Sequence, residues 1–82
     1  PGAFGYLRVQ VASFAEQGNA QSLAGNLRGQ YPDVRIEVVE LSAGRRYRVH
    51  VGRFSSERQA QAVADRIESQ LQVEPLVVRD DT

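Results

Sequence analysis

Polar side chains that can bind an anion or an amide recur at alternate positions in two stretches of the chain. Residues 7–14 read LRVQVASF and residues 47–54 read YRVHVGRF, so apolar and polar side chains alternate in both. Successive side chains of a β-strand point to opposite faces of its sheet, so each stretch is predicted to bury one face and expose the other. The positions expected to face outward are Arg8, Gln10 and Ala12 in the first stretch and Arg48 and His50 in the second. Arg offers paired donors to carboxylates, and Gln and His exchange hydrogen bonds with amides and hydroxyls.

This outward face has two interpretations. It is either a surface for a polar ligand or the ordinary solvated face of an antiparallel sheet. All ten basic residues are Arg, and five of them lie between residues 45 and 58. Such a local cluster favours the binding of anions, although codon usage in a GC-rich genome explains the missing lysines equally well.

The composition excludes several other functions. Ten acidic residues balance the ten basic ones, so no overall charge attracts the chain to nucleic acid or to an anionic membrane. The chain has one histidine and no cysteine, so we expect no metal site and no cofactor. No Ser-His-acid spacing is evident, and Glu37 and Glu40 would point to opposite faces of a strand, so we expect a module without catalytic residues.

The length of the chain predicts one domain, spanning residues 1–82, in which residues 1–5 form a lead-in anchored by Phe4. No apolar run approaches the about 20 residues of a membrane span, so no direct membrane contact is expected. No leader pattern opens the sequence. A start at Pro1 suggests a module excised from a longer protein, whose targeting segment would lie elsewhere, and we expect this module to be a monomer.

The spacing of apolar residues predicts how helices and strands alternate along the chain. A strand at residues 6–13 is followed by a helix that Asn19 caps and that ends before Gly29. Residues 34–41 and a stretch starting at Arg45 form a hairpin in which Ile36 and Val38 point inward.

A second helix and a final strand complete the expected order. Residues 56–59 fit a capping box, in which the Ser56 hydroxyl and the Gln59 side chain each bind a free backbone N–H, and they open the second helix. A short strand at residues 73–79 is placed at a sheet edge, because Pro75 cannot donate to a ladder.

The resulting fold class is α+β, with the βαββαβ order of ferredoxin-like and ribonucleoprotein-like folds. Each helix has one apolar stripe, so two helices should cover one face of a four-stranded antiparallel sheet and leave the other open. A shift of forty positions superimposes Arg8 on Arg48, Phe14 on Phe54 and Ala24 on Ala64. Two βα units built to one pattern explain the apolar matches.

The repeated motif resembles the SPOR domain of bacterial cell-division and cell-wall proteins. The resemblance rests on residues 6–14, on the Ala and Leu residues of 19–27, on residues 47–54, and on Ala60 and Ala64. It covers nearly the whole chain. It implies non-catalytic binding of peptidoglycan glycan strands that lack stem peptides, and through it the targeting of a parent protein to the division septum. The implied location is the periplasm of a Gram-negative bacterium. The implied parent protein is a lipoprotein anchored in the outer membrane, or one that carries a lytic transglycosylase.

The resemblance also implies a ligand site on the open sheet face. The Gln and Ser of the family's first strand match Gln10 and Ser13, whereas Ala12 stands where Gly is common. The free lactyl carboxylate of a stripped muramic acid would pair with arginines, and amide, hydroxyl and imidazole groups would serve acetamides and hydroxyls. The full set of expected glycan-binding residues is Arg8, Gln10, Ala12, Ser13, Arg35, Glu37, Arg46, Arg48 and His50.

Two other functions remain as alternatives. An RNA-binding sheet of ribonucleoprotein type stacks bases on aromatic residues of its central strands, and none of the outward positions there is aromatic, so no nucleic-acid partner is expected. A protein-binding module would use Tyr31 or the exposed edge of the last strand, which the fold alone does not exclude.

Overall fold

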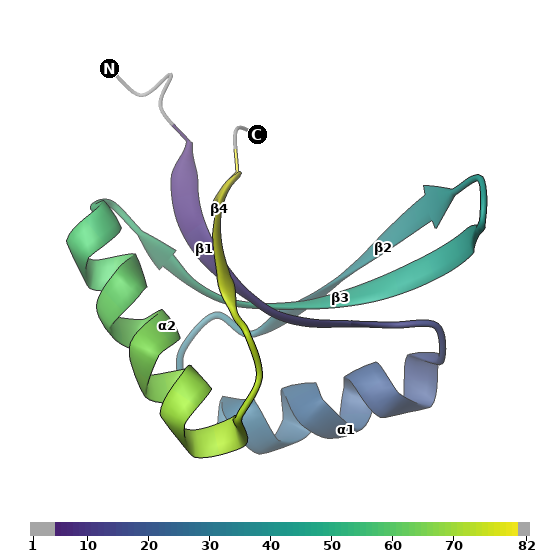
Figure 1. Cartoon of the computed structure of the whole chain (residues 1–82), viewed down its shortest axis with the longest axis horizontal. Helices are drawn as coiled ribbons and strands as arrows, with labels where there is room; N and C mark the ends of the chain where they lie inside the picture. Colours follow the sequence, from purple (N-terminus) through teal and green to yellow (C-terminus); the bar gives the residue numbers. More distant parts are fainter. Residues whose placement is uncertain (1–4, 81–82) are drawn as a thin grey trace.

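In the computed structural model, residues 5–80 form a single sheet with two helices (Figure 1). The predicted Phe4 anchor lies outside the described residues. The elements in chain order are β1 (Tyr6–Phe14), α1 (Gln17–Arg28), β2 (Arg35–Leu41), β3 (Gly44–Phe54), α2 (Glu57–Leu71) and β4 (Leu76–Asp80).

The four strands are antiparallel and lie in the order β2-β3-β1-β4. Both helices lie on one side of the sheet, and the hairpin of β2 and β3 extends beyond them (Figure 1). The predicted fold class and the one-sided placement of the helices are confirmed. The position of β4 at an edge, after Pro75, also agrees with the prediction.

The core lies between the helices and the inner face of the sheet. Val9 and Val51 are opposite each other on the two central strands, and both are fully buried. The helices meet them with small residues, since Ala20 and Ala24 of α1 and Ala60 of α2 have no exposed surface. Small side chains let the helix backbones approach the sheet closely, which keeps the interior densely packed.

The hairpin tip departs from the predicted burial. Ile36 packs against the core, and Val38 lies on the same face, opposite Tyr47. Val38 is nevertheless 52% exposed, because the hairpin continues past the end of the helical layer (Figure 1).

The helix starts illustrate two kinds of cap. Ser56 accepts a hydrogen bond from the backbone N–H of Gln59 at 3.2 Å, which is the serine half of the predicted capping box. The predicted cap at Asn19 is wrong: α1 begins at Gln17, and its cap residue Glu16 makes no side-chain capping bond. The earlier start lets the Glu16 carbonyl accept from the N–H of the fully buried Ala20.

Each central strand carries a β-bulge, and the bulges break the simple alternation of faces. In β1 the pairing moves from Gln10 opposite His50 to Ala12 opposite Val49, so one extra residue lies between them. The prediction that Ala12 faces outward is therefore wrong, because Ala12 shares the inner face with Val49 and packs against the core. The next residue, Ser13, turns to the open face as a result.

The second bulge lies forty positions later, in β3. Leu7 pairs with Phe54 and Val9 with Val51, so between these pairs one residue of β1 lies opposite two of β3. Gly52 takes a positive φ of 82°, which suits glycine, and Arg53 is turned to the open face.

Candidate functional site

The open face of the sheet contains a hollow of about 490 Å³, within the size range of small-ligand sites. All four strands contribute to it. Its lining residues are Arg8, Gln10, Arg35, Ile36, Glu37, Arg48, His50, Val78, Arg79 and Asp80. The structure thus brings together most of the side chains predicted from the sequence, and we call this region the hollow.

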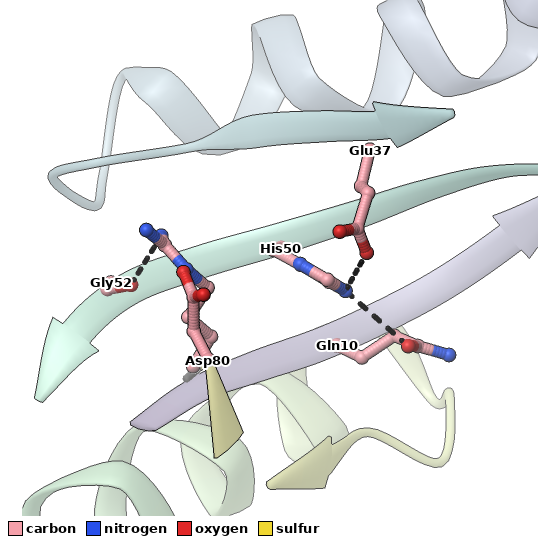
Figure 2. A network of polar contacts seen from close by, with 6 residues as sticks. Gln10, Glu37, His50, Gly52 and Asp80 are labelled. Carbon is pink, nitrogen blue, oxygen red and sulfur yellow. Dashed lines mark hydrogen bonds and ion pairs between the residues drawn. The ribbon is translucent and has the colours of Figure 1, made fainter. Parts of the chain in front are cut away.

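Arg8 forms the most buried polar contact of the hollow. Its side chain is only 4% exposed, and its Nε donates to Oδ2 of Asp80 at 2.6 Å. Its Nη1 donates to the carbonyl of Gly52 at 3.0 Å, so the guanidinium joins β1, β3 and β4 (Figure 2). Asp80 was missed by the sequence analysis, which ended the last strand at Arg79. The alternation of Val78 and Asp80 on β4 would have placed this carboxylate on the open face.

His50 lies at the centre of the hollow, between Gln10 and Glu37 (Figure 2). Its Nε2 is 3.3 Å from Oε1 of Gln10 and 4.0 Å from Oε1 of Glu37. Burial lowers the pKa of His50 below its ordinary value, and the positive charge of Arg8 adds to this effect while Glu37 opposes it. At neutral pH the ring is therefore uncharged. Because an amide oxygen only accepts, Nε2 carries the proton, and the amide nitrogen of Gln10 keeps its donors for a ligand.

Ser13 and Arg46 form a separate contact on the open face, beyond the hollow. Arg46 donates from Nε to the Ser13 hydroxyl at 3.0 Å and from Nη2 to the Ser13 carbonyl at 2.8 Å. Both acceptors are neutral, so the charge of Arg46 is not cancelled by this contact.

An aromatic residue also lies on the open face, contrary to the pattern expected from the central positions. Tyr6 is 42% exposed, and the guanidinium carbon of Arg53 lies 4.2 Å from the centre of its ring. Arg53 reaches this ring because the Gly52 bulge turns it outward. The exposed Leu76, opposite Gln10 on β4, adds a second apolar contact surface to this face.

Three further charged residues of the hollow come from β2 and β3. Arg35 lies opposite His50, and Glu37 lies opposite Arg48. Within residues 5–80, neither Arg35 nor Arg48 forms an ion pair. The Nε atom of Arg48 is buried and has no hydrogen-bond partner among the described residues.

The described residues provide no metal centre, since residues 5–80 hold no group of three or more His, Asp or Glu that could ligate an ion. None of the helices in this range has the length and apolar character needed to cross a membrane.

Comparison with known proteins identifies relatives of the same fold. The sequence pattern of the family described as "SPOR domain" matches residues 3–79. The crystal structure of the RlpA SPOR domain from Pseudomonas aeruginosa is 28% identical, with a TM-score of 0.79, over 90% of this chain and 99% of that one. The solution structure of the peptidoglycan-binding domain of the B. subtilis cell wall lytic enzyme CwlC is 30% identical, with a TM-score of 0.64, over 93% of this chain and 90% of that one. No curated protein sequence matches.

Proposed function

The chain belongs to the SPOR domain family, and from that premise we propose that its open sheet face binds peptidoglycan glycan strands that lack stem peptides. The family predicted from the sequence motifs is confirmed, and the RlpA SPOR domain of Pseudomonas aeruginosa shares the fold. The observation that carries the proposal is the hollow, in which arginine, amide and imidazole groups line the side of the sheet that the helices leave open.

The chemistry of a stripped strand matches these groups. Removing the stem peptide from N-acetylmuramic acid frees a lactyl carboxylate, which an arginine binds with a charge-assisted hydrogen bond. The amide donors of Gln10 suit the acetamide oxygens that every sugar of the strand carries. Tyr6 and Leu76, both exposed on this face, offer apolar contact to sugar rings.

An intact stem peptide would oppose binding in two ways. It converts the carboxylate into a neutral amide, which removes the charge-assisted bond, and it adds bulk next to the sugar. Selection of stripped strands then follows from one lost interaction and one steric conflict.

We infer that the domain binds without catalysing a reaction and so directs a parent protein to the wall. The CwlC relative supports this division of roles, since its peptidoglycan-binding domain is part of a cell wall lytic enzyme. Stripped glycan accumulates where amidases act during division. The parent protein would therefore concentrate at the division septum, in the periplasm.

A sacculus pull-down tests the proposal. Purified domain is incubated with sacculi before and after amidase treatment, and the bound fraction is measured at several protein concentrations. Retention of the domain is expected to rise after the amidase treatment. It should fall for Gln10→Ala, whereas the control Arg66→Gln, on the exposed side of α2, should be retained like the unsubstituted domain. Equal affinity for stripped and peptide-bearing fragments in a calorimetric titration would reject the proposal.

A further inference from the structure

The open face has an internal two-fold resemblance that follows the repeat of forty positions. Arg46 donates hydrogen bonds to Ser13, and the residues forty positions away from them, Tyr6 and Arg53, also contact each other, with the guanidinium over the aromatic ring. Each contact joins the residue after a bulge to the beginning of the neighbouring central strand. The two halves of the face are therefore built alike, with β1 and β4 in one half and β3 and β2 in the other.

The same comparison pairs Arg8 with Arg48, but their surroundings differ. Beside Arg8, the register places Asp80 of β4 opposite Tyr6. In the other half, the register places Val39 of β2 opposite Arg46. Val39 thus occupies the position that Asp80 holds in the first half.

This difference leaves Arg8 with an ion pair and Arg48 without one among residues 5–80, although Glu37 lies opposite Arg48 in the register. Nε of Arg8 donates to the Asp80 carboxylate at 2.6 Å, whereas Nε of Arg48, the equivalent atom, is buried and has no partner among residues 5–80. The neighbouring acid Glu40 is bound to the exposed Arg45 at 2.6 Å. Because the charge of Arg48 has no ion-pair partner among residues 5–80, an incoming anion gains more there than at an arginine that is already paired.

We propose that the carboxylate of the bound glycan pairs with Arg48, above Val39, in the place that Asp80 takes beside Arg8. This assignment rests on the proposed function and specifies it. Arg48 lines the hollow and is partly exposed, so a ligand reaches its guanidinium from that side. Arg46 is opposite Val39, and among residues 5–80 its bonds go to the neutral oxygens of Ser13, so it adds positive charge there that no carboxylate of this range cancels. In the other half, the Asp80 carboxylate would repel the same group.

The assignment separates arginines that bind ligand from arginines that hold the fold. Arg48 becomes the residue that distinguishes an acidic glycan from a neutral one. Arg8, with its ion pair to Asp80 and its bond to the Gly52 carbonyl, serves to position the strands.

The test compares two ligands of equal length. One is a stripped glycan fragment, and the other is a chitooligosaccharide, which keeps the acetamides but has no lactyl carboxylate. Calorimetric affinities for both ligands give a preference ratio for each variant. Arg48→Gln is expected to lower affinity for the stripped fragment about tenfold or more, the range for a hydrogen bond to a charged group, with little effect on the neutral ligand. Arg66→Gln on α2 is the matched control.

A second variant tests the idea without removing an arginine. Val39→Asp supplies the missing acid, so it is expected to neutralise Arg48 and abolish the preference for the acidic fragment, while the fold is retained by circular dichroism. The control Val39→Asn introduces a side chain of nearly the same shape as aspartate but without its charge, so it should keep the preference for the acidic fragment.

The outcomes separate this inference from the proposed function. Three results would overturn the assignment to Arg48. The preference for the acidic fragment could be unchanged in Arg48→Gln or Val39→Asp, or it could be lost equally in Val39→Asn. The unsubstituted domain could also bind both ligands equally well. If the unsubstituted domain binds neither ligand, the proposed function itself is wrong.

Discussion

Replacing Gly52 with alanine is the most demanding test of how the open face is built. Gly52 lies in the β3 bulge at a φ of 82°, and a Cβ placed there would be 2.2 Å from Cε2 and 2.3 Å from Cζ of the Phe54 ring. Its N–H donates to the Asp33 carbonyl at 3.1 Å, and its own carbonyl accepts from Arg8. The residue is therefore fixed by bonds on both sides and cannot move away from the ring without breaking them.

The expected destabilisation has two parts. A residue with a Cβ at positive φ costs about 1–2 kcal/mol. Separations near 2.2 Å are far inside van der Waals contact, so the Phe54 ring, which packs against the core, must shift. Overpacking of this kind costs about 1–3 kcal/mol. The sum of about 2–5 kcal/mol is a large part of the stability of a small domain and corresponds to a fall in Tm of about 10 °C or more.

Urea and thermal unfolding followed by circular dichroism measure this change. Gly25→Ala is the matched control, because Gly25 is exposed in the middle of α1 and a Cβ there meets nothing within 4 Å. Alanine at that position is expected to stabilise the domain by about 0.5–1 kcal/mol.

A double-mutant cycle separates the two contributions. In a Phe54→Ala background the ring is absent, so Gly52→Ala should cost only the backbone part of about 1–2 kcal/mol. The reasoning is refuted if Gly52→Ala costs less than about 1 kcal/mol, or if its cost is the same with and without the Phe54 ring.

Four further changes test separate parts of the structure. Burial lowers the pKa of His50, so the unfolded chain binds the proton more readily. The contribution of the neutral ring to the free energy of unfolding is complete above the unfolded pKa of about 6.5 and is lost as the pH falls below it. Urea titrations between pH 7.5 and 5.5 measure this loss, and His50→Gln should remove the part of it that is due to His50. Ser56→Ala should cost about 1 kcal/mol through loss of the α2 cap, and the adjacent Ser55→Ala almost nothing. Val9→Ala, in the centre of the core, should lower the free energy of unfolding by about 1–3 kcal/mol. Glu37→Gln removes a negative charge from the hollow, so calorimetry should show tighter binding of the stripped fragment and unchanged binding of chitooligosaccharide; weaker binding of the acidic ligand would contradict this.

The order of elements was predictable because periodicity reports which face of an element is buried. The alternation in residues 7–11 and the helical spacing of Ala20, Ala24 and Leu27 depend on the same core, and the structure buries them as predicted. The edge position of the last strand was also predicted correctly from Pro75, although the strand begins at Leu76, after the proline, and not at residue 73.

The bulges were not predictable from alternation. A strict period of two puts Gln10 and Ser13 on opposite faces, although the resemblance to the family assigned both to one site. The extra residue before Ala12 resolves the conflict, because it turns Ser13 outward and Ala12 inward. Only the pairing with β3 reveals the bulge, and no residue type in the stretch marks it in advance.

The partners of the arginines were also beyond the reach of the sequence. Arg8, Arg46 and Arg48 look alike as outward cations in a linear pattern. Whether each is neutralised depends on the register of the outer strands, which places Asp80 near one and Val39 near another. Register is set by pairing over the whole sheet, so it becomes visible only in three dimensions.

The two similar halves of the open face differ in charge, and this difference affects how a glycan strand can bind. A face with exact two-fold symmetry would accept a linear ligand equally well in either direction, since each orientation would make the same contacts. Asp80 and Val39 break that equivalence: one half carries an internal ion pair and the other an arginine whose Nε has no partner. Under the proposed pairing of a lactyl carboxylate with Arg48, reversing the directional glycan chain would bring such a carboxylate toward Asp80 instead. We therefore expect Asp80, besides holding Arg8 in its place between the strands, to disfavour the reversed orientation.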